Sequence, residues 1–157
     1  MDFVLNKELE NSNLIYVDLI KAKSLGELRK KINQAKGLVV VQGGNDEVNR
    51  EVLENRKVDI LLNPEFYREK DFIHFRNSGL NQVLCKLAKK NDTAIGFSFN
   101  NLMHSEKSEL TLGRMMQNVF LCRKFKLKMI LGSFAEKENE IKNQSELKSF
   151  GAVLGMN

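Results

Sequence analysis

Short apolar runs alternate with amphipathic segments along the chain. Runs with the composition of buried strands cover residues 38–42, 57–62, 93–99 and 127–131, and the stretch 14–20 has the same character. Strands of a parallel sheet are covered on both faces and are therefore almost continuously apolar, and successive parallel strands are usually joined by a helix. The alternation predicts an α/β fold with a mainly parallel sheet, covering helices and right-handed crossovers.

Several segments between these runs have apolar side chains at helical spacing. The clearest cover residues 25–35, 79–90 and 108–125, and each places its apolar side chains on one face. Before the second segment, Ser78 is a suitable N-cap residue, and Asn91 is a suitable stop after it. We therefore expect a helix over each of the three ranges.

The 108–125 segment predicts a helix with two contrasting faces. Its apolar arc contains Leu112, Met115, Met116, Val119, Phe120 and Cys122. The opposite face carries Arg114, Gln117, Asn118 and Lys124, with Leu121 among them. Leu121 is either an ordinary exposed leucine or the apolar anchor of a contact surface. On the second interpretation, the residues that bind a protein partner are Arg114, Gln117, Asn118 and Leu121.

The 79–90 segment has a basic side opposite its apolar stripe. That side carries Gln82, Lys86, Lys89 and Lys90, which suits plain solvation and RNA contact equally. Across all 157 residues, 25 Lys and Arg stand against 20 Asp and Glu, for a net charge of +5 and a pI of about 9.2. This surplus favours polyanionic partners without identifying one.

Residues 63–77 form an irregular segment that follows a predicted strand. It contains the single proline, Pro64. Its aromatic and polar side chains are Phe66, Tyr67, Arg68, Phe72, His74, Phe75 and Arg76. Loops at the carboxyl ends of parallel strands carry most functional sites in such folds. The rings of this loop either stack on nucleic-acid bases or, as loop aromatics do more often, tuck the loop onto the body of the protein.

Residues that could carry chemistry are few. Gly43 and Gly44 lie between a strand and the helix that Asn45 begins, where backbone N–H groups can hold a phosphate, although an ordinary turn has the same composition. The histidines are His74 and His104, and no HxH or HExxH motif is present. We therefore expect no catalytic residue and no protein-bound metal or cofactor.

Neither the cysteines nor the apolar runs point to an oxidising or membrane environment. Cys85 and Cys122 are far apart in sequence and suggest neither a disulfide framework nor a zinc site, so we expect buried thiols. The aliphatic stretch 38–41 is far shorter than the ~20 residues that span a bilayer. The N-terminus lacks a basic start followed by an apolar segment, so we expect a cytoplasmic protein without a membrane partner.

From Val39 onward, a series of ordered segments resembles archaeal ribonuclease P protein component 3 and its eukaryotic counterpart. Each segment is weak alone, but their order and spacing extend over about three quarters of the chain. They are residues 41–44 with Asn49 and Arg50, 57–61 with Pro64, 78–84 with 87–88 and Asn91, 114–118 with 121–124, and 130–133 with 145–147 and Gly151.

The resemblance implies a TIM-like barrel related to the polymerase and histidinol-phosphatase fold. It also implies a subunit of ribonuclease P, an endonuclease in which a catalytic RNA, with magnesium, removes the 5′ leader of precursor tRNA. The implied partners are this RNA, precursor tRNA, a small Pop5-like protein and other ribonuclease P proteins. The residues expected to bind RNA are Arg50, Arg76, Lys86, Lys89, Lys90, Arg123 and Lys124.

We expect residues 1–157 to form a single domain that is shortened at both ends relative to this family. Five or six strands cannot close an eight-stranded barrel, so a reduced or incomplete barrel is predicted. Two other functions stay open. One is a metal-dependent phosphoesterase that uses Asp59, His74 and His104, and the other is a noncatalytic protein scaffold.

Overall fold

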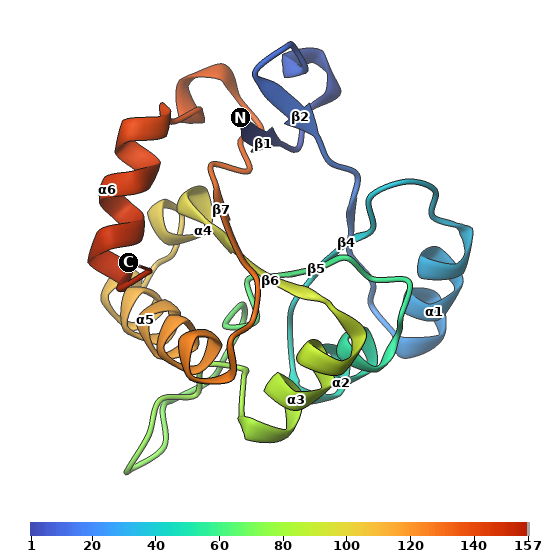
Figure 1. Ribbon diagram of the computed structural model, residues 1–157, viewed down its shortest axis with the longest axis vertical. Helices are drawn as coiled ribbons and strands as arrows, with labels where there is room; N and C mark the ends of the chain where they lie inside the picture. Colours follow the sequence, from blue (N-terminus) through green and yellow to red (C-terminus); the bar gives the residue numbers. More distant parts are fainter. Residues whose placement is uncertain (157) are drawn as a thin grey trace.

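The computed structural model describes residues 1–156 and contains short strands surrounded by helices (Figure 1). The strands are β1 (Asp2–Val4), β2 (Leu14–Tyr16), β3 (Leu19–Ile20), β4 (Val40–Gln42), β5 (Ile60–Leu62), β6 (Ala94–Ser98) and β7 (Met129–Gly132). The helices are α1 (Leu25–Gln34), α2 (Asp46–Glu54), α3 (Gln82–Asn91), α4 (Phe99–Met103), α5 (Ser108–Phe125) and α6 (Gln144–Leu154). Two 3₁₀ turns, η1 (Lys7–Leu9) and η2 (Glu138–Glu140), complete the set.

The strands form a ring in which every pairing is parallel. Strands β3, β4, β5, β6 and β7 make one sheet in that order, and β1 pairs with β2. Strand β2 belongs to the smaller sheet and β3 to the larger one, and the chain runs directly from β2 into β3, so it connects the two sheets. The remaining gap is bridged where Val4 pairs with Ala135 and the Leu5 N–H donates to the Ala135 carbonyl at 2.8 Å. The predicted α/β fold with a reduced TIM-like barrel is confirmed, and its ring is joined at this seam.

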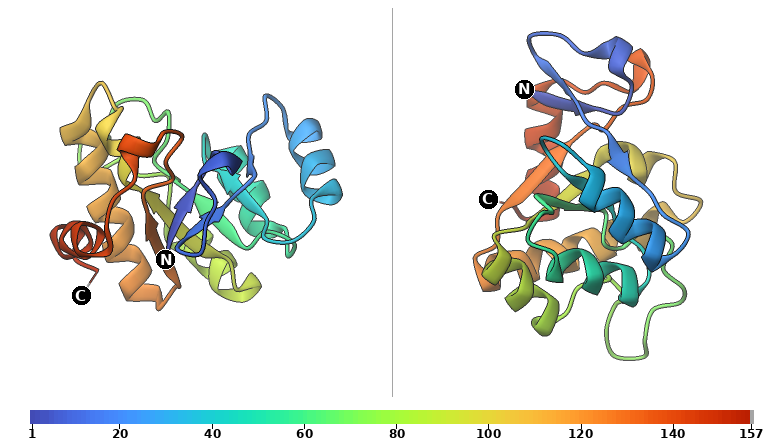
Figure 2. Two further views of the ribbon diagram at one scale, coloured as in Figure 1. Left: turned by 90° about the horizontal axis from the view of Figure 1, so that it is seen from above. Right: turned by 90° about the vertical axis from the view of Figure 1, so that its right-hand side faces the viewer.

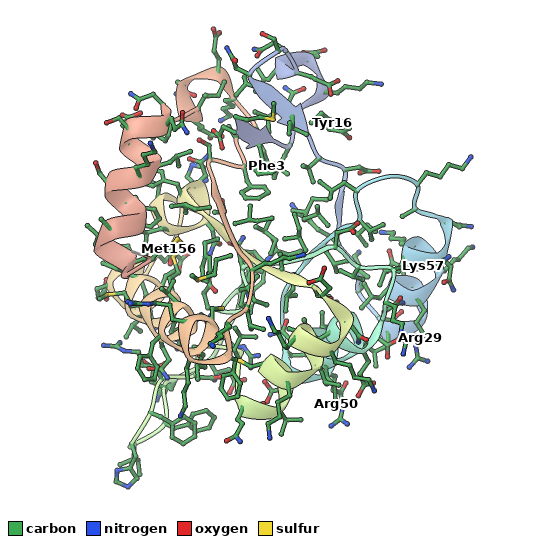
Figure 3. The ribbon with its side chains drawn as sticks, in the orientation of Figure 1. Phe3, Tyr16, Arg29, Arg50, Lys57 and Met156 are labelled. Atoms are coloured by element: carbon green, nitrogen blue, oxygen red, sulfur yellow. The ribbon has the colours of Figure 1, made fainter. Side chains whose placement is uncertain are left out.

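Alternation along the strands produces two hydrophobic cores. In β5, Ile60 and Leu62 point into the ring, whereas Leu61 packs under the helices. The ring interior is completed by the stacked rings of Phe3 and Phe134, whose centroids are 5.4 Å apart, and Phe3 lies toward its centre in Figure 3. Both faces of these strands are therefore buried, which explains their continuous apolar runs.

Most predicted elements are present, with corrections at their ends. The α5 helix has the predicted bounds, and both cysteines are buried and unpaired as expected. The N-cap of α3 is Asn81, and the prediction of Ser78 is wrong. Gly79 has φ +84°, and a Cβ there would overlap the Pro64 carbonyl oxygen, so the chain is not helical at this point. Strand β1 and helices α4 and α6 were not predicted.

No helix within residues 1–156 is long and apolar enough to cross a bilayer. The helices instead cover the outside of the ring (Figure 1), and the loop between β5 and α3 projects from the end of the molecule opposite β1 and β2 (Figure 2).

The seam of the ring relies on one buried carboxylate. Asp2 is 6% exposed, and its Oδ1 accepts from the Ser133 N–H at 2.7 Å and from the Phe3 N–H at 2.7 Å. Only one bridge pair joins β1 to the segment after β7. The carboxylate therefore takes the place of a backbone acceptor that a longer strand would supply.

We expect Asp2→Ala to destabilise the protein by about 1–3 kcal/mol, because the buried Ser133 N–H would lose its acceptor. Urea unfolding measures this loss, and hydrogen exchange should accelerate at Leu5 and Ser133 first. The control is Glu10→Ala, which removes an exposed carboxylate from the same N-terminal segment. Equal stability of the two variants would show that Asp2 does not hold the seam.

Candidate functional site

The long loop between β5 and α3 is fastened to α5 by Arg114. The Arg114 side chain is only 6% exposed, and its Nε donates to Asp71 Oδ1 at 2.8 Å. The same guanidinium donates to the carbonyl oxygens of Arg68, at 3.2 Å, and Glu69. A buried arginine is stable only where its donors are paired, and here the loop backbone supplies the acceptors.

Further contacts hold both sides of this loop. Arg68 pairs with Asp46 at the start of α2, at 2.5 Å, and Asp71 Oδ1 accepts from the Asn77 N–H at 2.9 Å. The Arg76 guanidinium lies directly against α5, since a Cβ at Gly113 would overlap Arg76 Nη1. Glycine at position 113 therefore permits the loop to approach the helix closely.

The tip of this fastened loop exposes apolar side chains. The Phe72 N–H donates to the Phe75 carbonyl at 3.0 Å, and the two rings lie 4.5 Å apart. Ile73 between them is 95% exposed, and Tyr67 is also strongly exposed. The interpretation that the loop aromatics tuck onto the body is wrong for these side chains. An ordered, exposed apolar tip is characteristic of a contact surface.

The apolar arc predicted for α5 is buried at Met115, Val119 and Cys122, but other side chains of the helix are oriented differently from the prediction. Arg114 and Asn118 are buried, and Leu121 packs against the main core. The prediction that they lie on an exposed polar face is wrong, because the loop covers Arg114 and Asn118. Met116 and Phe120, which were expected in the core, are instead exposed. Of the predicted partner-binding set, Gln117 is half-buried.

We define the apolar surface as Phe72, Ile73 and Phe75 of the loop together with Met116 and Phe120 of α5, all of which are exposed. The loop also forms one wall of a cleft of about 970 Å³, whose other wall includes Leu110 and Thr111 of α5. The loop therefore has an apolar tip and, on the side that faces α5, borders this cleft.

A buried carboxylate lies beneath the loop. Glu65 is 3% exposed, and its Oε2 accepts from Asn118 Nδ2 at 3.1 Å. The same Asn118 nitrogen donates to the Ser78 carbonyl at 2.8 Å, so one amide ties both ends of the loop to α5. Burial raises the pKa of Glu65 to about 7, although the Asn118 hydrogen bond and the charges of Arg114 and Arg68 favour the carboxylate.

The predicted RNA-binding residues lie on the outer surface of neighbouring elements. Helices α2, α3 and α5 stand in a row, because α3 packs against both of the others. Arg50 on α2 is exposed and forms an ion pair with Glu54. Figure 3 shows Arg50 at the outer edge of the row. The exposed cations on α3 are Lys86, Lys89 and Lys90, and those on α5 are Arg123 and Lys124. We call these six side chains the basic surface, and Arg76 lies apart from them on the loop.

Two cations of the basic surface also donate hydrogen bonds to carbonyl groups at the C-terminal ends of helices. Lys89 Nζ donates to the Lys126 carbonyl at 2.7 Å, at the end of α5, and Arg123 donates to the Gly155 carbonyl at 3.0 Å, at the end of α6. Cations are favourable near helix C-termini. Lys86 and Lys90 have no ion-pair partner among residues 1–156, so their charge is fully available to a ligand.

The residues considered for other chemistry are not brought together. Asp59 lies at the opposite end of β5 from the loop, where it accepts from the Val39 N–H at 2.7 Å. His74 is at the loop tip, and His104 lines a pocket at the mouth of the ring. Within residues 1–156, no three His, Cys, Asp or Glu side chains are grouped as metal ligands.

The N–H groups of Gly43 and Gly44 already donate to acceptors within the protein. This favours the interpretation of the two glycines as an ordinary turn over their interpretation as a phosphate site. The Gly43 N–H donates to the Leu62 carbonyl at 2.6 Å, and the Gly44 N–H donates to Asn49 Oδ1 at 2.9 Å. Asn49 is fully buried and also donates to the carbonyls of Pro64 and Gly79. Its role as a link between this turn and the loop was not predicted.

The raised pKa of Glu65 predicts a specific pH dependence. The folded protein holds this proton up to about pH 7, whereas the unfolded chain releases it near its ordinary value of 4.5. The contribution of Glu65 to the free energy of unfolding is therefore fully present below pH 4.5. About 3 kcal/mol of this free energy is lost as the pH rises from there to about 7. Glu65→Gln should remove this loss, so the variant should be clearly more stable than the wild type at about pH 8 but not at about pH 4.5.

Urea unfolding of both proteins across this pH range measures the difference. The control is Glu69→Gln, which removes an exposed carboxylate from the same loop. A constant difference between Glu65→Gln and the wild type at all pH values would contradict a proton on Glu65.

Comparison with known proteins places these features in a family. Residues 8–157 match the family model described as RNase P subunit p30. A ribonuclease P protein component 3 of Methanosarcina barkeri is 34% identical over 134 residues, which cover 84% of this chain and 51% of the relative. The protein of the same name from Methanocaldococcus jannaschii is 31% identical over 136 residues, or 83% of this chain and 56% of the relative. The chain thus spans about half the length of these curated relatives.

A solved structure has the same fold. A chain of the cryo-EM structure of archaeal ribonuclease P with mature tRNA superposes with a TM-score of 0.75 and 30% sequence identity. The match covers 87% of this chain and 58% of that chain. Because a family model matches nearly the whole sequence and this fold agrees with it, the chain belongs to the ribonuclease P subunit p30 family.

Proposed function

We propose that this chain is a noncatalytic subunit of ribonuclease P, which supports a catalytic RNA in removing the 5′ leader from precursor tRNA. The observation that carries the proposal is the match of its barrel to a chain of archaeal ribonuclease P, at a TM-score of 0.75. In this role the RNA performs the hydrolysis and uses magnesium, and the protein acts in the cytoplasm by binding.

The basic surface supplies the contact with RNA. Its cations are spread over three neighbouring helices, which suits a phosphate backbone that runs across them. Binding of Lys and Arg to phosphate releases counterions, so affinity falls steeply with salt concentration. Arg76 contributes a further cation beside α5. The ligands of this surface are ribonuclease P RNA and its precursor tRNA.

The apolar surface supplies the contact with a protein subunit, a small protein of the Pop5 kind. Isolated aliphatic side chains gain little from RNA, whereas Ile73, Met116 and Phe120 can fill apolar pockets of a protein. The Arg114 contacts hold the loop in one conformation before binding, which lowers the entropic cost of association. The apolar surface thus takes the place of the polar face of α5 as the proposed site of partner binding.

A protein-binding scaffold is the second candidate, favoured by the apolar surface. It differs from the proposed function in one respect, because a scaffold needs no RNA affinity. The phosphoesterase finds no support in the placement of Asp59, His74 and His104, which lie in separate regions.

Reconstitution tests the proposed function. The protein is added to the cognate ribonuclease P RNA and the other protein subunits, and precursor-tRNA cleavage is followed at several magnesium concentrations. We expect faster cleavage and a lower magnesium requirement when the chain is present. Cleavage that is unaffected by the chain would refute the subunit role.

Replacing Lys86, Lys89 and Lys90 by Ala should weaken RNA binding and make the plot of log affinity against log salt shallower, by about 1 for each phosphate that the variant no longer neutralises. Filter binding across a salt series measures the slope. The matched control replaces Lys7, Lys36 and Lys148, which are exposed and scattered over other parts of the molecule. If both triple variants have the wild-type slope, the basic surface on α3 does not contact RNA.

Ile73→Asp should weaken binding of the small protein partner by about 2 kcal/mol or more, because a charge would enter an apolar contact. Stability should change by less than about 0.5 kcal/mol, since the side chain is 95% exposed. Calorimetric titration with the purified partner measures the affinity. Val153→Asp, at an exposed apolar residue of α6, is the control. Equal affinities of the two variants would place the partner elsewhere.

A further inference from the structure

A pocket of about 190 Å³ opens at the mouth of the ring, where the strands end. Gln42 is the last residue of β4, Asn63 follows β5, and Ser98 ends β6, and all three line it. This is the face at which barrel proteins place their functional sites. Nothing in the basic surface or the apolar surface uses these residues.

The interior of the pocket is apolar and bounded by rings. Leu62 and Phe134 are buried beneath it, and Leu5, Leu19 and Phe66 form its half-buried walls. The volume is smaller than the roughly 300 Å³ at which sites for drug-sized ligands begin. The pocket therefore suits one small ring system with apolar faces.

Amide groups surround this apolar interior and retain free hydrogen-bonding capacity. Asn63 is 3% exposed, and its Oδ1 accepts from the Ser98 N–H at 2.9 Å, whereas its Nδ2 has no protein acceptor within residues 1–156. Gln42 uses its Nε2 in long contacts of 3.3 and 3.4 Å to the Gly43 and Leu62 carbonyls, which leaves Oε1 as an acceptor. A donor and an acceptor on adjacent strands match the edge of a nucleobase.

Charged and polar side chains line the mouth. Lys21 and His104 are both exposed. Glu136 and Glu140 also line it, and Glu140 Oε1 lies 3.5 Å from His104 Nε2. The carboxylates oppose a bare anion in this space. Glu140 Oε2 already accepts from the Glu136 and Lys137 N–H groups, at 2.9 and 3.2 Å. The exposed Glu136 carboxylate is therefore the better acceptor for an exocyclic amino group, as carboxylates are for cytosine.

We propose that the mouth of the ring holds one unpaired nucleobase of an RNA, with its faces against the apolar walls and its phosphate toward Lys21. Cytosine, adenine and guanine have an exocyclic amino group and fit the carboxylates, whereas uracil does not. The inference rests on the RNA-binding role proposed above, but it concerns a separate surface from the basic helices.

The first test is a titration of the ¹⁵N-labelled protein with cytidine monophosphate, uridine monophosphate and inorganic phosphate. We expect cytidine monophosphate to shift the amide signals of Gly43, Asn63 and Asn101, with a dissociation constant of about 1 mM. Uridine monophosphate should bind several-fold more weakly, and phosphate should leave these signals in place. Equal shifts with phosphate would reveal a plain anion site and overturn the inference, as would the absence of any shift.

Variants separate this site from the basic surface. Gln42→Leu keeps the size of a half-buried side chain, and it should weaken cytidine monophosphate binding at least fivefold. Lys90→Ala, on α3, should not affect nucleotide binding but should weaken RNA binding. Wild-type nucleotide affinity of Gln42→Leu would overturn the assignment, while the RNA-binding role of α3 would stand.

A single-stranded cytidine oligonucleotide distinguishes an RNA base from a free nucleotide. The oligonucleotide should displace cytidine monophosphate and shift the same mouth amides. Failure of the oligonucleotide to compete would overturn the RNA source of the base. If the oligonucleotide does compete but reconstituted cleavage is unaffected by the chain, the pocket assignment survives and the subunit role fails.

Discussion

The whole structure depends on closing a small ring of parallel strands. An open parallel sheet would leave unpaired N–H and C=O groups along both edges. Here β1 pairs with β2 on one side and, through Val4 and Ala135, reaches the segment after β7 on the other. Closure brings Leu5 and Glu136 to the same pocket although they lie far apart in sequence. The apolar ring interior and the polar mouth are two consequences of the same seam.

The loop between β5 and α3 is the second feature on which function depends. A buried guanidinium and a buried carboxyl group are costly unless their partners are in place. Arg114 and Glu65 meet this condition through the loop backbone, Asp71 and Asn118. The interaction is reciprocal, because the loop supplies acceptors to α5 and α5 holds the loop out from the body. The paired burial of these two groups thus fixes the base of the loop and its apolar tip.

Three surfaces of different chemistry result, and none of them needs the chain to catalyse a reaction. The basic surface on α2, α3 and α5 suits phosphate, the apolar surface on the loop and α5 suits protein, and the amide-lined mouth suits a single base. A barrel fold supports such variety because its loops vary while its strands stay in place. This division of surfaces fits the proposed role of a subunit that binds an RNA and a protein neighbour at once.

Local patterns in the sequence were sufficient to determine the parallel α/β class, the positions of most strands, and the bounds of α5, because side-chain periodicity reflects backbone geometry directly. The family resemblance rested on the same ordered segments. Strand β1 could not be predicted, because its three residues are stable only beside Ala135 and β2. The apolar pattern of α5 predicted burial of Met115, Val119 and Cys122, but tertiary structure alone decided the burial of the side chains around them. Hydrophobicity placed Phe120 in the core and Arg114 outside, but the loop folds its backbone carbonyls and Asp71 onto Arg114, whereas Phe120 stays exposed. Burial depends on what lies across from a face as well as on its polarity.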